Sequence, residues 1–428
     1  MEGRTYADGL GELSDLYCEA FGAILHLYGL TIGKWKRKNL SRFPIQVEYF
    51  EIEYIVSFAV YSASQSPIPL ALTAFELVSP SISQWVGNTV TQDEIFSRYH
   101  ANSLFGGESI PSEFVQELAE LGTLIMHYRV STYYSAEEAS YGLKCSTRLT
   151  LSLENSKPVS EVMRLVHELI TFFTFLIGGF FDLDEVRLWS SDNSINASSL
   201  YFSRMRPYGR PAKSPWIPFS QNLRPGHQYL PSFPLSAFSQ YFAFSGSERM
   251  YLKKYLAYRE MENIEEQFLG FFRLLEKLTF QSAAFVSEEK LSSLLSRSKG
   301  YLERFFGDRK SVHRLIQQIP KTNRSKINTA GCLVKFLKTT PESFREGWVL
   351  GVRDIQKICK LRNDLTHANE AEPEELNIAQ VTKFIEVLLV MVLLQRLGIS
   401  MNDVLQFLPR LDSYSLILKP PEVKQVLM

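Results

Sequence analysis

The front of the chain carries short runs of β-branched and aromatic residues in which apolar and polar positions partly alternate. Such runs cover residues 45–63, 68–78, 123–134 and 147–153. This composition at a period of two is typical of β-strands, and the first run predicts a strand or a pair of strands. Residues 159–180 have a helical period instead, so we expect one helix laid across a mostly β domain.

Seven prolines follow between Arg206 and Pro234, interleaved with aromatic side chains. Prolines at this density exclude both helices and interior strands. We interpret the stretch as an ordered connector whose aromatic residues pack on the β domain; a recognition surface for a partner or for stacked bases is the alternative. The aromatic residues are Tyr208, Trp216, Phe219 and Tyr229.

From Ser247 onward the apolar residues recur every three or four positions, which predicts helices at 262–280, 291–306, 333–337, 355–365 and 376–397. Thr340-Pro341-Glu342 has the residue types of a helix start. Together these segments suffice for a bundle of roughly four to six helices. The expected fold class is therefore α+β in two domains. A β-rich domain spans residues 1–247, with the connector at about 190–247, and an all-α bundle spans residues 248–428.

Composition limits the partners and the compartment. With 428 residues and 45% hydrophobic content, the chain can bury the cores of two domains. Lys plus Arg and Asp plus Glu number 46 each, so any attraction to nucleic acid must be local. The four cysteines, Cys18, Cys145, Cys332 and Cys359, form no C-x-x-C pair, which fits a reducing cytoplasm and predicts neither a disulfide framework nor a zinc site.

The chain gives no sign of membrane association or of a cofactor. The N-terminus lacks a basic start followed by an apolar run, and the apolar stretch at 169–181 is too short to span a bilayer. His167-Glu168-Leu169-Ile170-Thr171 begins like a zinc-protease motif but has Thr171 in place of the second histidine. Phosphate-binding glycine loops and nucleophile elbows do not occur. We expect no metal and no cofactor.

A local basic run lies between Arg304 and Lys338, where nine cations face Asp308 alone. Cations of this kind can hold RNA phosphates without reading bases, although a solvated loop is the competing interpretation. The residues that we expect to bind RNA are Arg309, Lys310, Arg314, Lys321, Arg324 and Lys326.

Candidate catalytic chemistry lies at the end of the predicted helix 355–365, in Leu361-Arg362-Asn363-Asp364-Leu365-Thr366-His367. An arginine can stabilise charge on a phosphate, and a histidine can move a proton near neutral pH. Taken singly, His367 could merely cap the helix, and Arg362 could pair with Asp364, Glu370 or Glu372.

Arg362, Asn363 and His367 match the three named positions of the R-[N/D/H]-x3-5-H signature, and in this the chain resembles the HEPN superfamily of helical ribonucleases. The region from about 250 to 428 is similar to the Apea-like HEPN branch, including Phe271-Phe272-Arg273-Leu274-Leu275-Glu276. The front resembles an ApeA-type N-terminal domain through Leu70-Ala71-Leu72-Thr73-Ala74-Phe75-Glu76-Leu77 and the run 148–189.

The resemblance implies a metal-independent endoribonuclease with toxin-like activity in abortive anti-phage defence. RNA would be cut by attack of the ribose 2′-OH, leaving a 2′,3′-cyclic phosphate and a 5′-OH, and the β-rich domain would sense a phage-derived trigger or restrain the nuclease. Arg362 would stabilise the phosphorane, Asn363 would orient the arginine or the phosphate, and His367 would take or relay the proton. Two alternatives stay open: a non-catalytic HEPN scaffold that binds RNA or a protein, and a bundle that works beside a separate nucleotidyltransferase.

The spacing of the motif also bears on assembly. At about 100° per residue, Arg362 and His367 differ by about 140° around a helix, whereas Asn363 and His367 differ by only about 40°. One straight helix therefore does not direct Arg362 and His367 at one phosphate. We expect a homodimer or a higher even oligomer in which a two-fold axis near this helix completes the site; a distorted helix end near Ala368 is the alternative.

Overall fold

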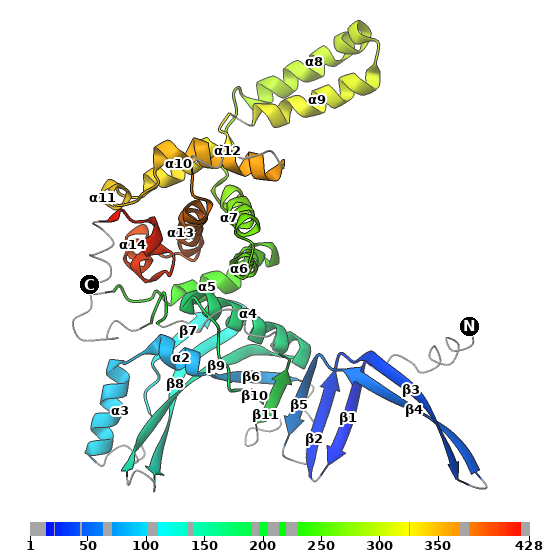
Figure 1. Cartoon of the computed structure of the whole chain (residues 1–428), viewed down its shortest axis with the longest axis vertical. Coiled ribbons are helices and arrows are strands. Elements are labelled where there is room, and N and C mark those ends of the chain that lie inside the picture. The colour runs from blue at the N-terminus through cyan, green and yellow to red at the C-terminus, as the bar shows by residue number, and fades with distance from the viewer. Residues whose placement is uncertain are drawn as a thin grey trace. The chain divides into compact units, whose positions relative to one another are not determined.

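The computed structural model describes residues 14–20, 22–42, 45–62, 71–101, 110–135, 140–190, 197–203, 214–219, 230–324, 326–367 and 376–420. The chain divides into two compact units, Met1–Phe244 and Ser245–Met428. The first unit is built mainly of strands and the second of helices (Figure 1). The predicted α+β fold class is confirmed.

The first unit is organised around a large antiparallel sheet. Within the described residues, nine strands follow the order β1-β2-β5-β11-β10-β6-β9-β8-β7, and β3 and β4 form a separate two-stranded sheet. The strands are β1 (Asp15–Ala20), β2 (Ala23–Tyr28), β3 (Thr31–Arg42), β4 (Ile45–Ile55), β5 (Phe58–Ser62), β6 (Leu72–Val78), β7 (Phe114–Leu118), β8 (Gly122–Ser135), β9 (Ser140–Lys157), β10 (Glu185–Trp189) and β11 (Ser198–Phe202).

Strand pairing differs from the sequence expectation in one region. The run 45–63 does contain two strands, β4 and β5, but they do not pair with each other: β4 pairs with β3, and β5 pairs with β2 and β11. Strand β6 lies between β10 and β9, which come more than 70 residues later in the chain. Pairing of this kind depends on contacts far apart in sequence, which a local pattern does not encode.

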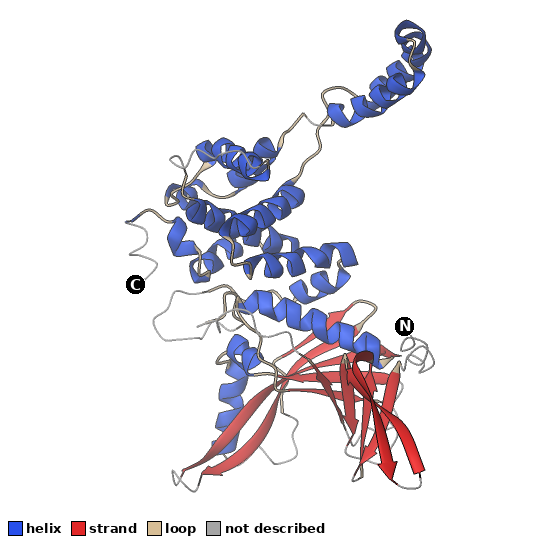
Figure 2. Cartoon of the chain, turned by 45° about the vertical axis from the view of Figure 1, so that its right-hand side comes forward, coloured by secondary structure: helices blue, strands red, loops and turns tan. Residues whose placement is uncertain are grey.

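The predicted helix across the sheet is α4 (Val159–Ile177), which Figure 2 shows lying against the strands. It ends at Gly178, whose φ of 72° lies in the left-handed region. A Cβ atom there would come within 2.0 Å of Trp216 Cδ2, so both the backbone angle and the packing require glycine. The unit's other helices are α2 (Pro80–Val86), α3 (Val90–His100) and α5 (Ser236–Ala243).

The proline-rich connector is partly described. Trp216 is buried, and its backbone N–H donates to Ile177 O at 3.3 Å; the Phe219 ring lies 5.2 Å from that of Trp85. These two aromatic residues pack on the first unit as expected, whereas Tyr208 and Tyr229 lie outside the described residues. The expected span is wrong in one respect, because residues 198–202 form β11 inside the sheet.

The second unit is helical, and its core helix is α13 (Ile378–Arg396), which is apolar around most of its circumference. By length and composition α13 could cross a membrane, but 72% of its most apolar window is buried among the other helices, as in a core helix. The other helical elements are α6 (Gly246–Arg259), α7 (Ile264–Thr279), α8 (Glu288–Phe306), α9 (Arg309–Asn323), α10 (Thr329–Thr339), α11 (Glu342–Glu346), η1 (Val352–Asp354), α12 (Ile355–Thr366), α14 (Met401–Phe407), η2 (Leu408–Arg410) and η3 (Tyr414–Ile417).

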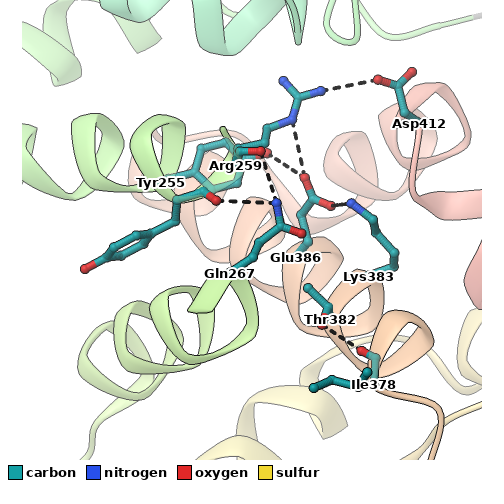
Figure 3. A network of polar contacts seen from close by, with 9 residues as sticks. Tyr255, Arg259, Gln267, Ile378, Thr382, Lys383, Glu386 and Asp412 are labelled. Atoms are coloured by element: carbon teal, nitrogen blue, oxygen red, sulfur yellow. Dashed lines mark hydrogen bonds and ion pairs between the residues drawn. The ribbon is translucent and has the colours of Figure 1, made fainter. Parts of the chain in front are cut away.

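A buried carboxylate joins α13 to α6. Glu386 is 2% exposed, and it accepts a hydrogen bond from Tyr255 Oη at 3.3 Å and one from Lys383 Nζ at 3.0 Å (Figure 3). Arg259 Nε lies 3.5 Å from the same carboxylate and also pairs with Asp412. Since a buried charge is costly unless it is paired, these contacts fix α6, α13 and the C-terminal segment to one another.

Candidate active site

The motif helix α12 is held between α7 and α10 (Figure 1). Its apolar residues Ile355 and Ile358 are fully buried, which sets the rotation of the helix and brings the side chain of Arg362 toward α7. The helix continues regularly to Thr366, and His367 is its C-cap residue. The predicted helix at 355–365 is therefore present at the expected place.

Arg362 is fixed by three contacts. Its Nη2 donates to Glu276 Oε1 on α7 at 2.7 Å, and its Nη1 donates to Asn363 Oδ1 at 2.9 Å. The centre of the guanidinium lies 5.1 Å from the ring centroid of Phe272, one helical turn before Glu276. With an ion pair at one end, an amide at the other and a ring against its face, the guanidinium has a defined plane.

Glu276 is itself fixed by α10. Thr329, the first residue of that helix, donates its hydroxyl to Glu276 Oε1 at 2.5 Å, the same oxygen that binds Arg362. Asn328 caps α10 by accepting from Gly331 N at 2.8 Å, which holds Thr329 in the first turn. Three helices therefore meet at one carboxylate oxygen.

One guanidinium nitrogen remains open to a ligand. Arg362 Nε is buried and has no hydrogen-bond partner within the described part of the chain. The neighbouring thiol of Cys359 is no competing nucleophile, because burial raises its pKa to about 11 despite the nearby charge of Arg362. The chemistry of this corner therefore rests on the arginine.

His367 occupies a different position. Its backbone N–H donates to Asn363 O at 3.0 Å, and its side chain is exposed. Within the described residues, no hydrogen bond joins its imidazole to Arg362 or Asn363. The structure thus brings Arg362 and Asn363 side chains together and leaves His367 free at the helix end, as expected for a regular helix.

The acid that pairs with Arg362 was not identified from the sequence. Pairing with Asp364 was one interpretation, but the partner is Glu276; Glu370 and Glu372 lie outside the described residues. The segment that contains Phe272 and Glu276 was noted only for its resemblance. The available signal was their spacing of four residues, which places both side chains on one side of α7.

The predicted basic run is helical over most of its length, so its interpretation as a solvated loop is wrong there. Arg309, Lys310, Arg314 and Lys321 are exposed on α9, Arg324 caps that helix, and Lys326 is exposed just beyond it. Arg324 donates two hydrogen bonds of 2.8 Å to Glu288, and Arg309 Nε lies 3.6 Å from Glu303 Oε1. These two cations are therefore partly neutralised within the chain.

Metal and disulfide chemistry find no support in the described part of the chain. No cluster of three His, Cys, Asp or Glu side chains there could hold a metal ion, and the four cysteines are unpaired. Glu168 of the incomplete zinc-protease motif is buried and accepts a hydrogen bond of 2.7 Å from Tyr241 Oη, which is a structural role.

Comparison with known families identifies both units. A family model described as the ApeA N-terminal domain 1 matches residues 16–241, and one described as Apea-like HEPN matches residues 269–403. No curated protein and no solved structure matches the chain. HEPN domains are generally ribonucleases that bind RNA and typically dimerise, and this branch is associated with anti-phage defence. Since the first match alone covers more than half of the sequence, the chain belongs to the ApeA family and carries an Apea-like HEPN domain.

Proposed function

We propose that this protein is a metal-independent endoribonuclease that acts as a toxin-like effector of abortive anti-phage defence in the cytoplasm. The observation that carries the proposal is the fixed guanidinium of Arg362, held by Glu276 and Asn363 on a HEPN helix that ends in an exposed histidine. A positioned cation beside a proton-transfer group is what phosphodiester cleavage without a metal requires.

In the proposed reaction the ribose 2′-OH attacks the adjacent phosphorus and the O5′ atom leaves. His367 takes or relays the proton of the 2′-OH, Arg362 stabilises the negative charge of the phosphorane, and Asn363 orients the arginine. The products are a 2′,3′-cyclic phosphate and a 5′-OH. DNA is inert because it lacks the attacking hydroxyl.

The exposed cations of and beside α9 supply the phosphate contacts in this proposal. They are Arg309, Lys310, Arg314, Lys321, Arg324 and Lys326. Arg324 and Arg309 contribute less than the others, because Glu288 and Glu303 already offset part of their charge.

We further propose that the active form is a homodimer or a higher even oligomer. The regular helical path from Arg362 to His367 supports this, because one chain does not direct both side chains at one phosphate. The N-terminal β-rich domain restrains or activates the nuclease in response to a phage-derived trigger.

The test is expression of the wild type, Arg362→Ala and His367→Ala, with mapping of RNA ends across total RNA. Each variant should lose most cleavage and keep its fold, and a chelator should have no effect. Lys360→Ala is a matched control, since Lys360 is an exposed cation on the same helix. Full cleavage by either catalytic variant, or strict Mg²⁺ dependence, would contradict the mechanism; intact RNA with preserved defence in all variants would indicate a non-catalytic scaffold.

A further inference from the structure

The α8–α9 hairpin has an apolar stripe that its own packing does not use. The two helices pack on each other, and their buried residues are Leu295 and Val312. On α8, however, Leu294, Tyr301 and Phe305 are 59%, 62% and 68% exposed. Their spacings of seven and four residues place all three on one side of the helix, displaced from the side of Leu295.

The aromatic residues of this stripe are already arranged as a stack. The Tyr301 and Phe305 rings lie 5.9 Å apart between centroids, with planes 22° apart. Phe306 packs edge-on against Phe305 at 5.1 Å. Exposed, nearly parallel rings are the feature on which proteins stack unpaired nucleic-acid bases.

Cations run alongside the aromatic residues. Lys290, Arg297 and Arg304 are exposed and recur every seven residues, so they form a stripe with steps of about 10 Å along α8. Arg297 and Arg304 lie one turn before and after Tyr301. Within the described residues none of the three cations has an acidic partner; Arg304 Nε donates only to Gly300 O, at 3.2 Å.

This charge pattern argues against a second copy of the chain as the occupant. If two α8 helices paired antiparallel about a two-fold axis near Arg297, that arginine would meet its own copy and Lys290 would meet Arg304. Like charges would then face one another along the contact, which is unfavourable. The same stripe attracts a polyanion.

The hairpin is also fastened to the candidate active site. In its neck, Phe285 N donates to Asn323 O at 3.0 Å and Lys326 N donates to Ala283 O at 3.1 Å. The chain then enters α10, where Thr329 binds the Glu276 oxygen that pairs with Arg362. A strand held on α8 is therefore held on a hairpin whose neck leads directly to the proposed catalytic arginine.

We propose that the exposed side of α8 is a binding site for single-stranded RNA, in which Tyr301 and Phe305 stack unpaired bases while Lys290, Arg297 and Arg304 contact phosphates. The inference rests on the proposed function and adds a base-stacking site separate from the basic run on α9. It makes the preferred substrate unpaired RNA, because bases within a duplex do not present their faces to the rings.

The test uses the full chain carrying His367→Ala, so that RNA stays intact, with Tyr301→Leu and Phe305→Leu added. Leucine keeps the apolar area and the helix propensity but removes the aromatic face. Fluorescence anisotropy with a 20-nucleotide single strand should show about 10- to 100-fold weaker binding, while the weak binding of the matching duplex changes little. Tyr133→Leu with Tyr134→Leu, an exposed aromatic pair on β8, is the matched control and should bind RNA normally.

A second variant, Arg297→Gln with Arg304→Gln, should flatten the salt dependence of single-strand binding while leaving the Tyr301–Phe305 stack intact. Unchanged single-strand affinity in the leucine variant, or an equal loss for the duplex, would overturn the proposal. Loss of oligomers with intact RNA binding would assign the stripe to a second copy, and binding to anionic vesicles in place of RNA would assign it to a membrane. Wild-type protein that binds through these rings but cuts no RNA would refute the proposed nuclease and leave this site standing.

Discussion

Glu276→Gln separates the charge that orients Arg362 from the shape of the site. Glutamine keeps the size of the side chain and an oxygen that can still accept from Arg362 Nη2 and Thr329 Oγ1, now 2.7 and 2.5 Å away. Only the negative charge is lost. Because the Arg362 and Glu276 side chains are 25% and 31% exposed, their ion pair is shielded from solvent more than a surface pair would be.

The expected magnitude follows from that burial. A hydrogen bond between charged groups contributes about 1.5–3 kcal/mol and a neutral one about 1 kcal/mol, so the substitution should cost about 1–2 kcal/mol of stability. For a helical unit of this size that is a fall in Tm of roughly 2–8 °C. If the same loss applies to arginine positioning in the transition state, kcat falls about 5- to 30-fold with little change in KM.

The assay pairs thermal unfolding of the full chain with cleavage kinetics on an RNA identified by end mapping. Glu288→Gln is the matched control, because its ion pair with Arg324 is exposed at both ends and should leave Tm and kcat unchanged. Wild-type Tm and kcat in Glu276→Gln would refute the positioning role. A higher kcat would show that Glu276 restrains Arg362 instead of orienting it.

Three further results are expected. Replacing Lys321, Arg324 and Lys326 together with Gln should weaken RNA binding and reduce its salt slope by about 0.7 for each lost contact, closer to two contacts than three because Glu288 already pairs with Arg324; an unchanged slope would exclude these cations from the interface. Mixing inactive Arg362→Ala with inactive His367→Ala under subunit exchange should partly restore cleavage, whereas a monomer of full specific activity, at concentrations where light scattering detects no dimer, would disprove the shared site. Burial raises the pKa of Tyr255 well above its usual value of about 10, so above pH 10 the unfolded chain loses a proton that the folded chain keeps, and stability falls by up to about 1.4 kcal/mol per pH unit for this group; urea unfolding should show a flatter decline in Tyr255→Phe, and parallel curves would count against the assignment.

The sequence by itself determined the elements whose patterns are local. The apolar repeat of α4, α7 and α13 and the β-branched runs of β6 and β8 placed these elements within a few residues of their observed ends. The order of Arg362, Asn363 and His367 on one helix is equally local, since four residues of helix fix how far apart the side chains point. Helix α9 was missed as a helix, because its cations drew attention away from the helical spacing of Val312 and Ile316.

Tertiary structure alone decided which distant segments meet. Glu276 lies 86 positions before Arg362, and Thr329 lies between them, so the shared carboxylate oxygen follows from the packing of α7, α10 and α12 on one another. The place of β6 between β10 and β9 and the stacked, exposed rings of α8 are of the same kind. Residue type and spacing set the local backbone, but which charges pair and which rings stay exposed depends on the free energy of contacts formed across the whole folded unit.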